Sequence, residues 1–288
     1  MSTESQPLLR TLLVLGRVSN LPTVWTNCLA GWVLGGDGEL NRLLILCAGA
    51  SAMYIGGMYL NDAFDVAWDH AHKNDRPIPS GHIPERPVWI LGWLLLLGGL
   101  APICMMGERP ALLGIQLGVC ILAYDALHKR ISWSPFLMAG CRFYLLLVAA
   151  SAASDGINGL AIWMAVVLGA YILGLSYVAK AESLPGPLQY WPLIFLGSPI
   201  ALAFLVNDEE FRRDGLLVSA ILGLWIIRSL RNLFWTKDKK IGKAVCGLLA
   251  GICLVDLLAV AFVPPMFAGL FIAGFLLSLL FQRYVPAT

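Results

Sequence analysis

Residues 61–81 read NDAFDVAWDHAHKNDRPIPSG and stand where a long apolar run meets a polar loop. Asp62, Asp65 and Asp69 fall at positions i, i+3 and i+7, and Asn61 lies one turn before Asp65, so an α-helix carries all four on one face. Three carboxylates on one face repel one another unless a cation lies between them. Oxygen ligands without thiols suit a hard ion, above all Mg²⁺, which prefers a few carboxylates plus substrate phosphates. The pattern predicts a metal site.

The competing interpretation of this stretch is a solvated, acidic helix end. It is disfavoured because the rest of the helix is apolar all round, and ionisable groups at membrane depth are usually functional. The composition puts the chain in a membrane: its 288 residues are 58% hydrophobic and 13% charged, with a mean hydropathy of +0.75. A soluble domain has about a quarter of its residues charged.

We therefore predict an all-α, polytopic membrane bundle in a single domain over residues 1–288. A helix needs about twenty apolar residues to cross the hydrocarbon core. Such runs lie at 13–36, 41–63, 87–106, 110–128, 134–153, 159–181, 188–206, 214–236, 243–263 and 265–283. The count is nine or ten transmembrane helices, because only Pro264 and Pro265 separate the last two.

Lysine and arginine are concentrated in alternate connections, including the loop that follows the aspartates. The positive-inside rule then places the N-terminus and the Asp-rich site on the cytoplasmic side, and we predict the cell (inner) membrane. Arg17, Asn20 and Pro22 interrupt the first run, so no cleavable signal peptide is expected. The seven cysteines mostly lie inside apolar runs and are interpreted as buried apolar residues. No nucleic-acid partner is expected.

Buried polar residues inside the other runs have two interpretations each. Arg142 is a lone arginine in the fifth run and costs several kcal/mol unless it is paired or hydrated. It either pairs with Asp256 of the ninth run or binds an anionic substrate group. Asn27 in the first run either bonds a neighbouring helix or contacts substrate.

Basic and aromatic residues also gather at the cytoplasmic ends of three runs. They comprise Lys73 and Arg76 after the second run, Tyr124, Lys129 and Arg130 after the fourth, and Tyr177, Lys180 and Glu182 after the sixth. Positive-inside anchoring and snorkelling explain most of these charges without a site. If the helix ends converge, Lys180 brings a fixed cation to the aspartates.

These segments resemble the UbiA superfamily of intramembrane prenyltransferases. NDAFDVAWD followed by RPIPSG resembles the first Asp-rich signature of that family, which reads NDxxDxxxD and then RPxPSG. YDALHKR resembles the loop that follows its fourth helix, and SNLPTVWTNCLAG resembles its first helix. The order and spacing of these motifs match the family pattern over about the first half of the chain.

The resemblance implies a helical bundle around a central cavity that opens to lipid. In that family Asn61, Asp62, Asp65 and Asp69 would hold Mg²⁺ on a prenyl diphosphate, and Lys73, Arg76, Lys129 and Arg130 would contact the diphosphate. Loss of diphosphate would yield an allylic carbocation, which attacks a small or lipid acceptor. We assign catalysis to Asp62, Asp65, Tyr124 and Lys180, and substrate binding to Asn27, Asn61, Lys73, Arg76, Lys129, Arg130, Arg142, Tyr177 and Glu182.

One stretch departs from the family pattern. A second Asp-rich motif is expected at the end of the sixth helix, but the sequence there is SYVAKAES, with Glu182 as its one acid. We hypothesise that the Lys180 ammonium replaces the charge of one metal ion. The alternatives are a terpene cyclase of the same fold and a non-catalytic lipid-binding or transport-accessory protein. Prenyl chain length, acceptor and oligomeric state are left open.

Overall fold

The computed structural model describes residues 7–74, 76–180, 190–206, 212–234, 240–261 and 265–287, and all regular structure in these ranges is helical. The first elements are α1 (Leu8–Leu15), the 3-10 helix η1 (Val18–Asn20) and α2 (Leu21–Leu34). The others are α3 (Leu40–Phe64), α4 (Val66–His72), α5 (Glu85–Cys104), α6 (Glu108–Leu127), α7 (Ser134–Ala152), α8 (Gly159–Lys180), α9 (Leu193–Val206), α10 (Arg212–Phe234), α11 (Ile241–Ala259) and α12 (Pro265–Phe281).

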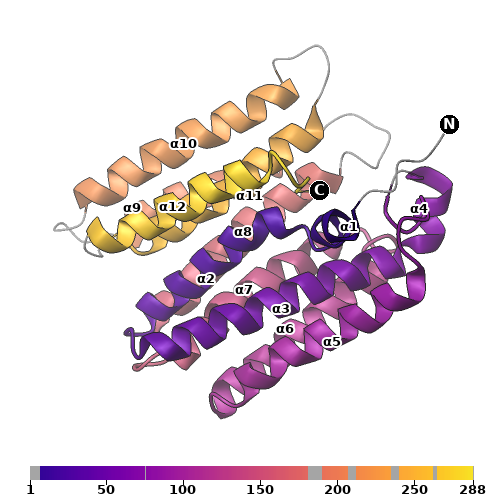
Figure 1. The fold of residues 1–288 in the computed structure, drawn as a ribbon. Helices are drawn as coiled ribbons and strands as arrows, with labels where there is room; N and C mark the ends of the chain where they lie inside the picture. Colours follow the sequence, from indigo (N-terminus) through magenta and orange to yellow (C-terminus); the bar gives the residue numbers. More distant parts are fainter. Residues whose placement is uncertain are drawn as a thin grey trace.

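Each of the ten predicted apolar runs contains a helix, and the long helices lie side by side as an elongated bundle (Figure 1). The short helices α1 and α4 lie together at one end, where the last described residues of the chain also lie (Figure 1). The first run is not one continuous helix. It breaks at Gly16 and Arg17, where Arg17 has a φ of 42° in the left-handed region.

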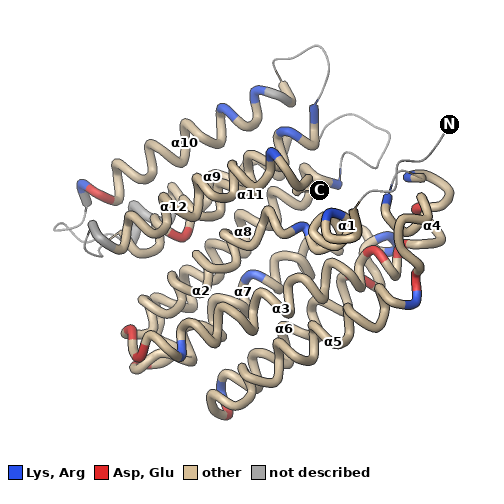
Figure 2. Tube along the Cα trace, in the orientation of Figure 1, with Lys and Arg blue, Asp and Glu red and all other residues tan. Residues whose placement is uncertain are grey.

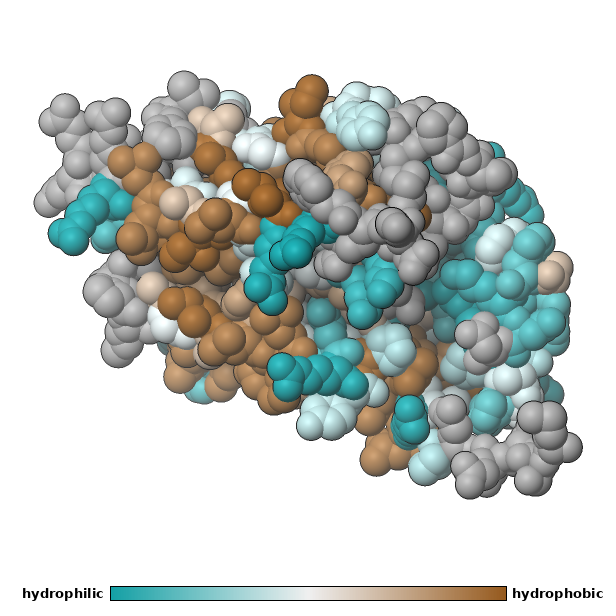
Figure 3. Space-filling view, turned by 90° about the horizontal axis from the view of Figure 1, so that it is seen from above, coloured by the Kyte–Doolittle hydropathy of each residue, from teal (hydrophilic) through white to brown (hydrophobic). Residues whose placement is uncertain are grey.

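The described residues contain six helices that are long and apolar enough to cross a membrane: α3, α5, α6, α7, α8 and α11. The apolar windows of α8 and α11 are 61% and 67% buried, against 28% for α5 and α6, so the first two form the interior and the last two the rim. On the face seen in Figure 3, apolar surface covers much of the bundle and hydrophilic residues gather towards one end. The membrane bundle is supported, while nine or ten crossings stay a prediction.

Glycines allow α3 and α5 to pack backbone against backbone. Gly49 and Gly56 of α3 face Gly99 and Gly92 of α5. A Cβ atom added at Gly56 would lie 2.6 Å from the backbone nitrogen of Leu96, and one at Gly99 would meet the carbonyl oxygen of Gly49. Small residues at such an interface let helices approach closely, which matters in lipid because burial of apolar area drives little association there.

Charged residues lie mostly at the helix ends (Figure 2). At the end that carries α1 and α4, basic and acidic residues lie together, and this is where α3 and α6 both finish. The bundle thus brings the Asp-rich stretch beside the YDALHKR segment, although 63 residues separate Asp65 from His128. The sequence had left open whether these helix ends converge, and the structure places them in contact.

Candidate active site

A cavity of about 530 Å³ runs from this charged end into the bundle, between α2, α3, α6, α7, α8 and α11. Its inner walls are apolar and include Val24, Met53, Leu117, Leu145, Ile172 and Ile252. Its polar lining includes Arg17, Asn61, Asp65, Lys73, Arg76, Tyr124, Asp125, His128, Lys129, Arg142 and Lys180. A charged mouth on an apolar pocket suits a ligand with an anionic head and a hydrocarbon tail.

The Asp-rich stretch is helical with an interruption at Asp65. Helix α3 ends at Phe64 and α4 begins at Val66, yet the Asp65 N–H bonds the Asn61 carbonyl at 3.0 Å and the Asp69 N–H bonds the Asp65 carbonyl at 2.8 Å. The helical bonding therefore continues through the break. Asp62, Asp65 and Asp69 are all buried.

Arginines from two different segments neutralise Asp62. Arg76 Nη1 lies 2.8 Å from Asp62 Oδ1 and 3.3 Å from Asp69 Oδ2, so one guanidinium joins two of the carboxylates. Arg17 Nη2 lies 3.2 Å from the same Asp62 oxygen. Arg17 arrives from the break between α1 and η1. In the sequence Arg17 only interrupts an apolar run, and this pattern does not place it in the site.

Asp65 is held by the end of α6. His128 Nε2 and Lys129 Nζ each lie 3.2 Å from Asp65 Oδ2, and the Lys129 ammonium also lies 3.3 Å from the centre of the Trp68 ring. Burial raises the pKa of Asp65, but the hydrogen bond and charge of His128, with Lys129, outweigh burial and hold that pKa below its ordinary value. At Asp69 burial dominates over Arg76, and the pKa is raised. His128 is a second site residue that the sequence analysis did not assign.

Asn61 links α3 to α6 through Asp125. Its Nδ2 donates to Asp125 Oδ1 at 3.1 Å, and its Oδ1 faces Arg17 Nη2 at 3.5 Å. Tyr124, one position earlier, lines the cavity and stacks on His128 with ring centres 4.9 Å apart. Asp125 was visible in the sequence as an acid beside Tyr124, but spacing alone did not show that it meets Asn61.

Of the other predicted site residues, some line the cavity and others lie away from it. Lys73 and Lys180 line the cavity, and Lys180 Nζ donates to the carbonyls of Ile131 and Ser132 at 2.9 and 3.1 Å. Arg130 is exposed. Tyr177 packs edge-on against Trp191 at 4.7 Å. Glu182 lies outside the described residues.

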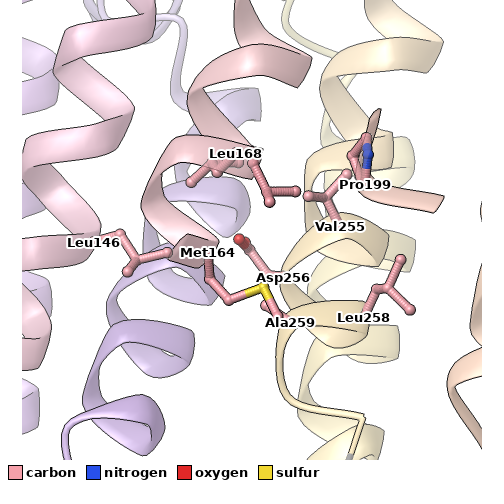
Figure 4. A pocket seen from close by; sticks show the side chains of 9 residues that line it. Leu146, Met164, Leu168, Pro199, Val255, Asp256, Leu258 and Ala259 are labelled. Atoms are coloured by element: carbon pink, nitrogen blue, oxygen red, sulfur yellow. The ribbon is translucent and has the colours of Figure 1, made fainter. Parts of the chain in front are cut away.

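Arg142 and Asp256 belong to one buried network in which Asn27 is the bridge. Arg142 Nη1 donates to Asn27 Oδ1 at 2.7 Å, and Asn27 Nδ2 donates to Asp256 at 2.7 Å. Thr26 Oγ1 also donates to Asp256, at 2.6 Å. On its other side Asp256 lies among apolar side chains, including Met164 and Leu168 (Figure 4). The interhelical bonding considered for Asn27 is present, and Arg142 reaches Asp256 through Asn27 instead of directly.

The donor set at the Asp-rich end has the chemistry that Mg²⁺ requires. No three His, Cys, Asp or Glu side chains within the described ranges converge as a metal cage. Mg²⁺ rarely uses such a cage, since one or two carboxylates with waters and substrate phosphates suffice. Asp69 Oδ1 and Asp125 Oδ2 are buried oxygens without a hydrogen-bond partner in the part of the chain that the structure describes, so they are available as ligands. The residues fit the ion.

Comparison with known proteins agrees with this geometry. The family described as "UbiA prenyltransferase family" matches residues 20–185. Digeranylgeranylglyceryl phosphate synthase of Ignicoccus hospitalis is 35% identical over 125 residues, which cover 43% of this chain and 37% of that protein. 4-hydroxybenzoate octaprenyltransferase of Photobacterium profundum is 29% identical over 145 residues, covering 50% of this chain and 49% of that protein. Both alignments thus span less than half of the relative's length.

A solved structure has the same fold. The UbiA homolog from Archaeoglobus fulgidus, bound to GPP and Mg²⁺, gives a TM-score of 0.64 at 13% identity and covers 92% of this chain and 99% of that one. At this identity the likeness concerns the fold alone. The family match, in contrast, spans more than half of the chain and includes both the Asp-rich stretch and YDALHKR. The chain therefore belongs to the UbiA prenyltransferase family.

Proposed function

We propose that this protein transfers a prenyl group from a prenyl diphosphate to a small or lipid acceptor inside the membrane, with Mg²⁺ as cofactor. The observation that supports this most is the cluster of buried carboxylates and cations at the mouth of an apolar cavity of about 530 Å³. Such a cavity accepts a hydrocarbon chain, while its mouth accepts a diphosphate. Relatives bearing prenyltransferase names support the same reaction.

Ionisation of the substrate is the step that the charged mouth would assist. The allylic C–O bond breaks, its electron pair leaves with the diphosphate, and the acceptor bonds to the carbocation and loses a proton. Arg17 and Arg76 share Asp62 and Lys129 lies on Asp65, so all three cations line the cavity mouth, where they could exchange carboxylate for phosphate oxygens. Fixed cations aimed at developing negative charge lower the barrier because they need little reorganisation.

The aspartates would hold the metal ion and the apolar walls would protect the carbocation. Asn61, Asp62, Asp65 and Asp69 offer oxygen ligands, and bound Mg²⁺ would supply positive charge to the departing diphosphate. The apolar walls formed by α2, α7 and α11 would keep water from the reactive carbon. We further propose that the mouth faces the cytoplasm, because the connections at this end are rich in lysine and arginine.

Release of inorganic diphosphate tests the proposal. Purified protein in lipid nanodiscs is offered prenyl diphosphates of several lengths, with and without Mg²⁺ and candidate acceptors, and the lipid products are analysed. We expect Mg²⁺-dependent release that Asp62→Ala and Asp65→Ala abolish, together with a prenylated acceptor. A cyclised hydrocarbon as product would indicate a cyclase. Binding without release, or release unaffected by both substitutions, would contradict the proposal.

A further inference from the structure

Asp125 is a buried carboxylate at the charged end of the cavity with an unused oxygen. It lies in α6, it is 3% exposed, and it belongs to the cavity lining. Its Oδ1 accepts one hydrogen bond, from Asn61 Nδ2 at 3.1 Å. Its Oδ2 is buried and has no hydrogen-bond partner among the described residues. A carboxylate has about four acceptor positions, so most of the capacity of this group is free.

Asp125 also differs from its acidic neighbours in its ion pairs. Asp62, Asp65 and Asp69 each face at least one cationic side chain within 3.3 Å. Within the described ranges Asp125 takes part in no ion pair, although Arg17, Asp62 and Asp65 are close enough to act on it electrostatically. Burying a carboxylate without a cation is costly, and a bound cation or a full set of hydrogen bonds offsets that cost.

Asp256 provides an internal comparison. It is also buried and also lacks a direct ion pair within the described ranges, but both of its oxygens accept hydrogen bonds, from Thr26 and Asn27. Asp256 is thus satisfied by the protein itself. Asp125, in contrast, lies beside Asn61 and the aspartates and is left half satisfied.

The neighbours of the unused oxygen point to a hard cation. The hydrogen bond to Asp125 uses the Nδ2 group of Asn61, and Asn61 Oδ1 has a long contact of 3.5 Å with Arg17 Nη2. Asn61 Oδ1 on α3 and Asp125 Oδ2 on α6 are therefore two oxygens on adjacent helices that could act as metal ligands. Oxygen donors of this kind suit Mg²⁺ or Mn²⁺.

We propose that Asp125 is a further ligand of the divalent cation that binds with the diphosphate, in addition to the Asp-rich stretch. This inference rests on the proposed function, because the cation arrives with the prenyl diphosphate. Asp125 would add negative charge on the α6 side of the site, opposite the carboxylates of α3 and α4. The cation would then join α6 to α3 as well as to the substrate.

The experiment measures Mn²⁺ binding by electron paramagnetic resonance in nanodiscs that contain the full chain. The probe is an unreactive thiolo analogue of a prenyl diphosphate, so no turnover occurs. Asp125→Asn keeps the shape and an oxygen that can accept from Asn61, but loses the charge. Asp125→Ala also loses the contact with Asn61. Asp155→Asn, an exposed aspartate at the opposite end of the bundle, is the matched control.

We expect Asp125→Asn and Asp125→Ala both to weaken Mn²⁺ binding by about tenfold or more, in the range seen for metal-site substitutions, while Asp155→Asn binds as wild type does. Thermal melting of each variant identifies unfolded protein, and Asp125→Glu, which keeps the charge, restores part of the affinity. Wild-type binding by Asp125→Asn would overturn the inference, and a loss confined to Asp125→Ala would reduce Asp125 to a positioning residue for Asn61. Absence of Mn²⁺ binding by wild-type protein with the analogue would overturn the proposed function as well.

Discussion

At the scale of single residues, the cations of the site lie against the carboxylates, where they supply the positive charge that a metal ion would also supply and that a diphosphate would need. Arg76 joins Asp62 to Asp69, and Lys129 with His128 covers Asp65. Buried carboxylates need such partners, because an unpaired charge in this environment is very costly. The same side chains that neutralise the carboxylates are therefore available to bind phosphate.

Substitution of Lys180 tests the hypothesis that its ammonium group replaces the charge of one metal ion. Lys180→Asp is expected to lower kcat/KM roughly 10- to 100-fold, because a fixed cation at the cavity is exchanged for an anion. Lys180→Met, which keeps the apolar stem, should lower it less. Activity is measured as diphosphate release. Lys243→Met removes a cation from an exposed position of α11 and is the control.

Unchanged or higher activity in Lys180→Asp would refute the hypothesis. Lys180 also donates to the backbone of Ile131 and Ser132, so the KM for the prenyl diphosphate and the thermal midpoint are recorded together. A lower midpoint with an unchanged KM would assign Lys180 to holding the connection between α6 and α7.

At the scale of helices, the contact between α3 and α5 tolerates no added atoms at its glycines. Gly56→Ala should destabilise the protein by about 2 kcal/mol, because the new methyl group meets backbone and overpacking of this kind is not relieved by side-chain movement. Gly98→Ala on α5 is the matched control, since its Cβ meets nothing within 4 Å. The control should be neutral or gain up to about 1 kcal/mol from helix propensity. Thermal unfolding in detergent measures both, and equal effects would contradict this account of the interface.

A second prediction at this scale separates the two interpretations of Asn27. Asn27→Leu should cost about 3 kcal/mol, because Arg142 loses an acceptor and Asp256 loses a donor in a fully buried place. Unfolding by denaturant measures the loss. If instead stability is kept and the KM for a substrate rises, Asn27 contacts substrate and the network of α2, α7 and α11 contributes little.

At the scale of the whole molecule, the proposed orientation in the membrane rests on the lysines and arginines at the end that carries the site. In a protein without its native cysteines, Asn74→Cys and Asp155→Cys should react with a membrane-impermeant maleimide from opposite sides. Cys at position 74 should react in inside-out vesicles, and Cys at position 155 in intact cells. Labelling of both from one side would contradict the topology, and the reverse pattern would contradict a cytoplasmic site.

The helices and the acidic face could be predicted from the sequence, because both depend on the pattern of residues that are near one another in the chain. Apolar runs of sufficient length must be helical in lipid, where every backbone group needs an internal partner. The spacing of Asp62, Asp65 and Asp69 survives the break at Asp65, since backbone hydrogen bonds continue through it. The sequence did not indicate the break itself, nor the one at Arg17.

The partners of the carboxylates depended on tertiary structure. Arg17 is 45 residues from Asp62 in sequence, and Asp125 is 64 residues from Asn61. Such contacts depend on how α1, η1 and α6 pack against α3, which glycines and side-chain shapes decide and hydrophobic periodicity does not encode. The sequence alone therefore determined a membrane bundle with an acidic helix face. Only the tertiary structure decided which cations neutralise that face, and that Asp125 beside it has no ion pair within the described ranges.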